Sequence, residues 1–194
     1  MMRLIILIVI SMSVAGCSDS HFEETKPGEF HGKLIVQWFD KDKFIYTPDE
    51  ENPLRFVRFN KETIVPERMF TDGGSIPRAL RILEDYSPWG YAPAFVIHDW
   101  LFHIKQCKLS GHEEYDFEET AWVMSEAMKT ITLQEKTEDP EKFTVYAMFE
   151  AVRSPLAENE WESGECDPPP ITTRGRIALK DLPSPIMEYV IEFP

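Results

Sequence analysis

The sequence predicts an α+β fold: a short antiparallel β-meander followed by three or four helices, two of them packed antiparallel around a His-Asp site. Residues 33–65 hold short runs of strand-forming residues that are separated by turn-forming clusters. From residue 93 onward, apolar residues recur at the three- and four-residue spacing of amphipathic helices. A chain of 194 residues is long enough for one domain with its own core.

Residues 1–17 have the features of a lipoprotein signal peptide. A positive charge at Arg3 precedes an apolar stretch over residues 4–14, which is too short to span a bilayer. Residues 14–17, Val-Ala-Gly-Cys, resemble a bacterial lipobox, in which the cysteine becomes lipidated and N-terminal. We therefore expect Cys17 to carry palmitate and other acyl chains, which together anchor a protein stably. An ordinary secretory signal with a chance cysteine is the alternative.

Charge and sorting signals predict the compartment and the partners. Ser18, in place of an aspartate after the lipidated cysteine, resembles the pattern that directs lipoproteins to the outer membrane, facing the periplasm. A net charge of −14 argues against nucleic acid as a partner, because its binding needs clustered lysine and arginine. It also argues against electrostatic docking on anionic lipid. We expect membrane contact through the N-terminal lipid, with a phospholipid or an envelope protein as partner.

The mature chain divides into three parts. Residues 18–29 are polar, charged and without periodicity, and this composition predicts a flexible tether. Residues 30–157 form the single α+β domain. Residues 158–194 are predicted to be an extended C-terminal wrap, in which residues 187–193 favour a final strand.

The β-region and the first helix follow from local patterns. Turn-forming residues delimit four short strand-forming runs, at residues 33–39, 44–46, 54–59 and 63–65. Ser75 can cap a short helix over residues 76–84, with Pro77 tolerated in its first turn.

Three further helices are predicted. The first runs over residues 93–105 and carries the His-Asp pair. The second has an acidic start, which suits a helix N-terminus, and a buried stripe of Phe117, Ala121, Met124, Met128 and Ile131. The third begins at Asp139 and Pro140 and ends at Arg153, before Pro155.

Cys107 and Cys166 are the two cysteines that remain once Cys17 is lipidated. An even number of cysteines in an oxidising compartment favours a disulfide between them. The bridge would close a loop of about 60 residues and stabilise the fold by about 4 kcal/mol in the chain-entropy model. Two free buried thiols are the alternative.

His98 and Asp99 lie in an otherwise apolar and aromatic run, where each needs a partner. Neighbouring helical side chains point about 100° apart, so the two are expected to serve separate tasks. His98 suits a general base for water, and Asp99 suits a Ca²⁺ ligand. Asp72 and the Gly73 carbonyl, at a glycine turn, would add oxygen ligands.

A purely structural reading of these residues stays open. An aspartate before two glycines is commonly a turn residue, and a histidine-aspartate step can cap a turn or bond to backbone. The remaining histidines, His21, His31, His103 and His112, form no zinc-binding pattern with the cysteines.

Three blocks of sequence resemble a phage and bacterial family of unknown function. They are Thr-Asp-Gly-Gly-Ser-Ile-Pro-Arg at residues 71–78, Pro-Trp-Gly at 88–90 and His-Asp-Trp-Leu-Phe at 98–102. The resemblance covers roughly residues 70–153, including Glu-Ala-Met at 126–128. It implies a phage association, and hence a prophage-encoded envelope lipoprotein.

The order of these elements is also similar to the helical scaffold of bacterial secreted phospholipase A₂. That resemblance implies Ca²⁺ binding by Asp72, Gly73 and Asp99, with His98 as the base. These enzymes orient the histidine with an aspartate seven residues before a methionine, but counting back from Met128 gives Ala121. Asp116 or Glu118 would have to replace it.

Two functions therefore remain. The first is a non-catalytic binding or envelope-protection lipoprotein on a phospholipase-like scaffold, which the alanine at position 121 favours. The alternative is a calcium-dependent, phospholipase-like ester hydrolase with His98 as general base.

Overall fold

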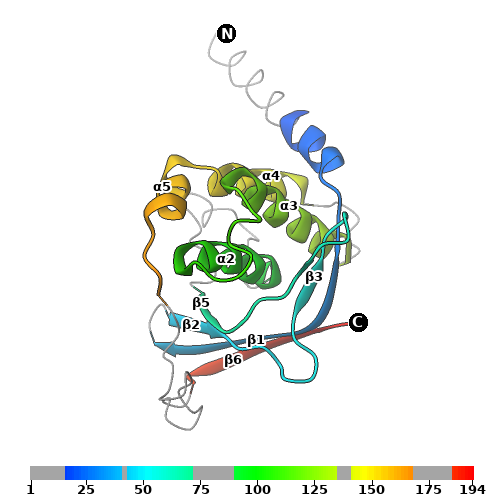
Figure 1. Cartoon of the computed structure of the whole chain (residues 1–194). Helices are drawn as coiled ribbons and strands as arrows, with labels where there is room; N and C mark the ends of the chain where they lie inside the picture. Colours follow the sequence, from blue (N-terminus) through cyan, green and yellow to red (C-terminus); the bar gives the residue numbers. More distant parts are fainter. Residues whose placement is uncertain (1–15, 41–42, 72–89, 135–140, 168–184) are drawn as a thin grey trace, which may run out of the picture.

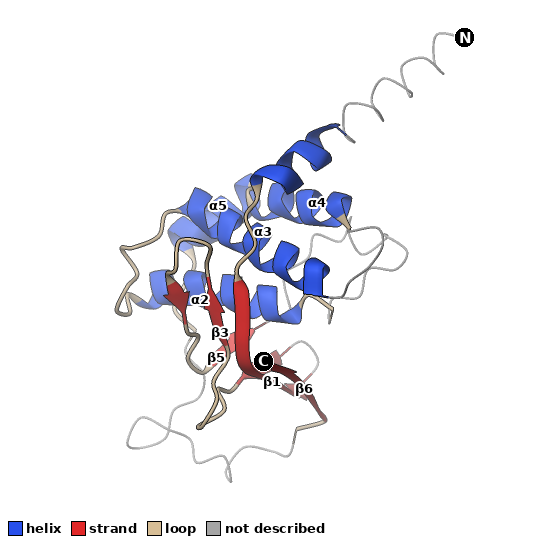
Figure 2. Ribbon diagram, turned by 90° about the vertical axis from the view of Figure 1, so that its right-hand side faces the viewer, coloured by secondary structure: helices blue, strands red, loops and turns tan. Residues whose placement is uncertain are grey.

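The computed structural model describes residues 16–40, 43–71, 90–134, 141–167 and 185–194. It has the predicted α+β class: a curled antiparallel sheet carries its helices on one side (Figures 1 and 2). No helix among the described residues has the length and apolar character needed to cross a bilayer.

The sheet is built around one long strand, β1 (Glu29–Asp40). Three strands pair with it antiparallel, namely β2 (Lys43–Tyr46), β3 (Arg55–Val57) and β6 (Met187–Phe193). The short strands β4 (Thr63–Ile64) and β5 (Met69–Thr71) extend it by pairing with β3 and β2. The last strand thus returns to the start of the domain, with Gly32 opposite Phe193.

β1 buries alternate side chains, because successive residues of a strand point to opposite faces. Phe30, Leu34 and Val36 are buried, while the intervening residues are partly exposed. Gly32 has a φ of +85°, and a Cβ there would collide with the Pro53 carbonyl. Only glycine suits this position, which lets the loop before β3 pack closely on β1.

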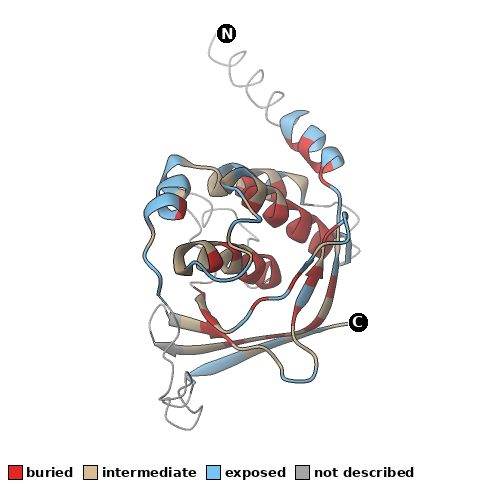
Figure 3. Cartoon of the chain, viewed as in Figure 1, coloured by how far each residue is buried: buried red, intermediate tan, exposed pale blue. Residues whose placement is uncertain are grey.

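The helices α2 (Ala92–Cys107), α3 (Phe117–Gln134) and α4 (Lys142–Val152) pack in that order. Figure 3 shows their buried residues turned towards one another and towards the sheet. Leu34 and Phe56 of the sheet join Ile97 of α2 and Met128 of α3 in one core. The predicted stripe along α3 is observed, with Ala121, Met124 and Met128 buried.

The N-terminal segment differs from the tether expected over residues 18–29. Residues 16–24 are helical, and Ser18, His21, Phe22 and Thr25 are buried along one side. Three of these four side chains are polar, so the segment lacks the apolar periodicity that indicates a packed helix. α3 supplies the hydrogen-bond partners that make their burial possible.

The C-terminal region also differs from an extended wrap that begins at residue 158. A further helix, α5 (Pro155–Ser163), follows α4 directly. Ser154 caps it by accepting a hydrogen bond from the Ala157 amide, and Pro155 occupies its first turn. The proline that indicated a helix end therefore also starts the next helix.

A disulfide joins Cys107 to Cys166, the pair that was expected to bridge. It links the end of α2 to the segment after α5. The helix expected over residues 76–84 and the helix start at Asp139 and Pro140 lie outside the described residues.

Candidate functional site

A cavity of about 510 Å³ lies between α2, α4, α5 and the end of β5. Its wall is mostly apolar and aromatic, formed by Phe70, Phe95, Phe102, Met124, Met148 and Leu156. The Leu156 side chain is 80% exposed, which places it at the rim of the opening.

The polar groups of the cavity come largely from one face of α2. His98, Asp99 and His103 line it there, and Glu160 of α5 and Asp167 line it near the C-terminal end of α2. No lysine or arginine is found among the described residues of its lining. The cavity therefore combines an apolar interior with an acidic polar edge.

Asp99 is held in place from the sheet. Thr71, the last residue of β5, donates a hydrogen bond from Oγ1 to Asp99 Oδ2 over 2.5 Å. The other carboxylate oxygen, Oδ1, lies 4.0 Å from His98 Nδ1, too far for a hydrogen bond. The side chains of His98 and Asp99 therefore form no hydrogen bond with each other through these two atoms.

His98 has an unusual environment. Its Nε2 is buried and has no hydrogen-bond partner among the described residues, and its ring lies 4.8 Å from that of Phe102. A buried polar atom without a partner costs free energy. Because His98 lines the cavity, its ring is one of the polar groups that a bound ligand would contact.

His103 lies one turn further along α2. Burial lowers its pKa, and the nearby carboxylates of Asp167 and Glu67 oppose that shift. The imidazole is therefore neutral at physiological pH, so it adds no positive charge to the acidic edge.

Of the three proposed calcium ligands, the structure describes one. Asp99 lines the cavity, whereas Asp72 and Gly73 lie outside the described residues. Within the described part of the chain, no three histidine, cysteine or acidic side chains converge as metal ligands.

The residues considered for orienting His98 have other roles. Ala121 is fully buried in α3 and is not part of the cavity lining. Asp116 accepts a hydrogen bond from the Glu119 amide at the start of α3, over 2.8 Å. Glu118 forms an ion pair of 2.7 Å with Arg153, which directly follows α4.

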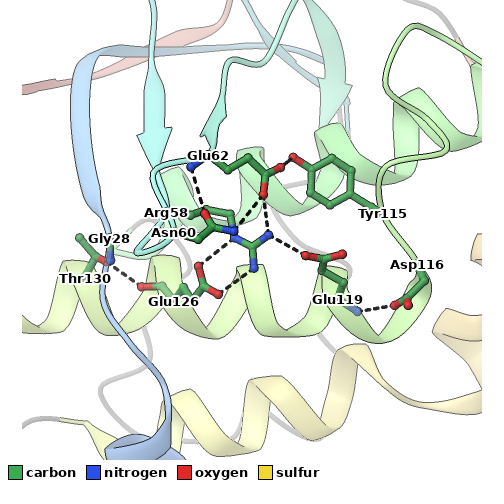
Figure 4. Close-up of polar contacts among 9 residues, drawn as sticks. All are labelled: Gly28, Arg58, Asn60, Glu62, Tyr115, Asp116, Glu119, Glu126 and Thr130. Atoms are coloured by element: carbon green, nitrogen blue, oxygen red, sulfur yellow. Dashed lines mark hydrogen bonds and ion pairs between the residues drawn. The ribbon is translucent and has the colours of Figure 1, made fainter.

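A second polar cluster, which the sequence did not indicate, surrounds Arg58 (Figure 4). The buried guanidinium binds Glu126 of α3 through two hydrogen bonds, of 3.0 and 2.9 Å. It also contacts Glu62 at 2.9 Å and Glu119 at 2.8 Å. Tyr115 donates its hydroxyl to Glu62. The cluster ties the hairpin of β3 and β4 to α3.

The charges in this cluster influence one another. Burial disfavours the charged form of Arg58, but the hydrogen bonds that it donates to Glu126 and Glu119 and the surrounding carboxylate charges outweigh burial and raise the pKa of Arg58. Burial, together with the neighbouring carboxylates of Glu62 and Glu119, raises the pKa of Glu126, and Arg58 opposes that shift. The one signal in the sequence is an acid at position 126, between the apolar residues of the α3 stripe.

Comparison with known proteins identifies the family. Neither curated proteins nor solved structures gave a match. One family model does match, that of DUF1353, described as a protein of unknown function, over residues 51–148. This segment runs from the loop before β3 into α4, and it contains His98, Asp99, Arg58 and Glu126. Because the match spans half of the sequence, the chain belongs to the DUF1353 family.

Proposed function

We propose that this protein is a lipid-anchored envelope protein that binds an amphiphilic molecule in the His98 cavity without altering it chemically. The observation that carries this proposal is the position of His98, which lines a mostly apolar cavity and whose buried Nε2 has no hydrogen-bond partner in the described part of the chain. An apolar cavity with a few converging polar groups is the usual form of a small-molecule site. A volume of about 510 Å³ lies within the range of such sites.

The lining selects a class of ligand. Apolar chains gain about 0.8 kcal/mol for each buried methylene group, and the aromatic wall offers such burial. Asp99, Glu160 and Asp167 place negative charge around the opening, and this charge disfavours an anionic head group. A neutral hydroxyl or ester, or a cationic amine, fits this edge better than a carboxylate or phosphate.

The environment of His98 supports binding over catalysis. A histidine acts as general base most effectively when an acid orients and stabilises the protonated ring. Here Asp99 Oδ1 lies 4.0 Å from Nδ1, and Asp116 and Glu118 are engaged elsewhere. The Nε2 of His98, which bonds to none of the residues that the structure describes, suits the acceptance or donation of one hydrogen bond to a head group.

Displacement of a fluorescent apolar probe, N-phenyl-1-naphthylamine, tests the ligand class. Dodecylamine and dodecanol should displace it at lower concentration than dodecanoate. Ala157→Phe should fill the cavity and weaken binding at least about tenfold, or 1.4 kcal/mol. The matched control is Asn159→Phe, on the exposed side of the same helix. Equal binding by both variants would overturn the proposal.

The anchor is tested separately. Incorporation of labelled palmitate into the full chain should occur, should disappear in Cys17→Ser, and should place the protein in the outer-membrane fraction. If the wild-type protein incorporated no labelled palmitate, the lipid anchor would be refuted and the cavity test would be unaffected.

One observation favours the calcium-dependent hydrolase as a second candidate. The hydrogen bond from Thr71 to Asp99 attaches the residue directly before Asp72 to the other proposed carboxylate ligand. In this candidate, Asp72, Gly73 and Asp99 hold Ca²⁺ and His98 activates water. Phospholipid hydrolysis by the soluble domain, with Ca²⁺ or with chelator, separates the two. Ca²⁺-dependent turnover that His98→Ala abolishes would replace the binding proposal.

A further inference from the structure

The helix at residues 16–24 is built into the domain, although it directly follows the lipidation motif. Its buried side faces α3 and α4, and Thr25 at its end is only 2% exposed. His21 occupies the centre of this contact. Its ring packs on Phe149 and Trp122 at centroid distances of 4.2 and 5.1 Å, and Nε2 lies 3.0 Å from Ser125 Oγ.

Lys129 of α3 holds the C-terminal end of this helix. Its buried ammonium donates hydrogen bonds to the carbonyls of Phe22 and Thr25, the latter over 2.8 Å. The last carbonyls of a helix have no partner within it, and a cation there also complements the helix dipole. The same ammonium lies 4.3 Å from the centre of the Phe22 ring.

The chain stays attached between this helix and the sheet. The Gly28 amide donates to Thr130 Oγ1 over 2.8 Å, and β1 begins at the next residue. A flexible chain over residues 18–29 would have spanned about 20 Å. Because the observed contacts hold residues 18–29 against the domain, Cys17 is not separated from the domain by such a flexible span.

The position of Cys17 defines a face of the molecule. Cys17 is exposed, and it lies beside Tyr146 on α4. The N-terminal helix, α4 and α5 lie on the side away from the sheet in both views (Figures 1 and 2). On this side Phe143 of α4 is 46% exposed and Leu156 of α5 is 80% exposed. Lys142 and Arg153 flank them.

We propose that the docked N-terminal helix fixes the orientation of the domain on the membrane, with the α4 face against the bilayer. Acyl chains on Cys17 must enter the bilayer at the surface of α4, because no free linker separates them from it. Phe143 and Leu156 can then contact the interface, where exposed apolar side chains are favoured. The sheet faces away from the membrane. This inference rests on the lipid anchor of the proposed function and not on the cavity ligand.

Quenching by membrane-bound quencher tests the orientation. The lipidated full chain is placed in vesicles of phosphatidylethanolamine and phosphatidylglycerol whose head groups carry a nitroxide quencher. A fluorophore is attached either at Glu150→Cys on α4 or at Val190→Cys on β6. Both side chains are exposed. The label at position 150 should be strongly quenched, and the label at position 190 should be nearly unaffected.

Two lysine variants provide the matched comparison. Lys129→Met removes the buried cap of the N-terminal helix, whereas Lys33→Met removes a surface ion pair to Glu192 between strands of the sheet. The quenching difference should largely disappear in the first variant and persist in the second. A Gly-Ser insertion between Ser18 and Asp19 should also abolish it.

The outcomes separate the two proposals. Palmitate incorporation with equal quenching at both positions would overturn the orientation and leave the anchor intact. Absence of palmitate would overturn both. Retention of the full difference in Lys129→Met and in the insertion variant would show that the docked helix does not set the orientation.

Discussion

Thr71 Oγ1 donates a hydrogen bond of 2.5 Å to Asp99 Oδ2 and so joins the end of β5 to the middle of α2. Thr71 is the last residue of the short strand β5, and Asp99 lines the apolar cavity. This bond fixes the carboxylate at the polar edge of the cavity beside His98. The geometry of the candidate site thus depends on the packing of a helix against an edge strand.

Loss of this hydrogen bond should destabilise the protein. Thr71→Val keeps the shape of the side chain but removes the donor to a charged acceptor. We expect the free energy of unfolding to fall by about 1.5–3 kcal/mol, as measured by urea denaturation. Thr63→Val, at an exposed strand position, should change it by less than about 0.5 kcal/mol. An equal effect of the two substitutions would contradict this role for Thr71.

The buried ion pair between Arg58 and Glu126 should be sensitive to removal of one partner. Arg58→Met leaves the buried Glu126 carboxylate without its cation, and we expect a loss of about 3–5 kcal/mol. The double variant Arg58→Met/Glu126→Met removes both charges and should recover much of that loss. Thermal and urea unfolding measure both effects. Additivity of the Arg58→Met and Glu126→Met effects in the double variant would show that the pair is not coupled.

Acid should loosen the N-terminal helix through His21. Burial lowers the pKa of His21 below 6.5, an effect that Arg153 and Lys129 reinforce and Glu24 opposes. The unfolded chain then binds more protons than the folded one just below pH 6.5. The stability contributed by neutral His21 is present above that pH and is lost as the pH falls towards the lowered pKa.

Hydrogen exchange of residues 16–25 measures this response. Exchange, corrected for its intrinsic pH dependence, should increase between pH 7 and pH 5. His21→Phe, which keeps an aromatic ring in the contact with Trp122 and Phe149, should remove most of the pH dependence. The same pH response in this variant would assign the effect to another group.

Reduction of the disulfide should lower stability without changing the fold class. Cys107 and Cys166 are 59 residues apart, and the chain-entropy model gives about 4 kcal/mol for such a loop. Cys107→Ser/Cys166→Ser should match the reduced wild-type protein in urea denaturation, and a reductant should not affect the variant. Unchanged stability on reduction of the wild-type protein would contradict the bridge.

Local patterns in the sequence determined much of the scaffold. The strand-forming run of β1, the stripe of α3 and the bounds of β6 follow from side-chain periodicity, because a buried face must repeat with the geometry of its element. Apolar periodicity does not reveal α5, because Trp161 is its single buried residue, and Ser154 and Pro155 are the local signs of its start. β5 has three residues and depends on pairing with β2.

Tertiary structure decided the rest, since it sets which distant groups meet. The sequence by itself singled out His98 and Asp99 as polar residues in an apolar run. It could not indicate that Thr71 would bind Asp99, or that His98 Nε2 would be left without a partner among the described residues. The N-terminal helix and the Arg58 cluster are held by hydrogen bonds and ion pairs to α3. Such contacts leave no periodic signal in either partner, because their energy arises only when burial removes both groups from water.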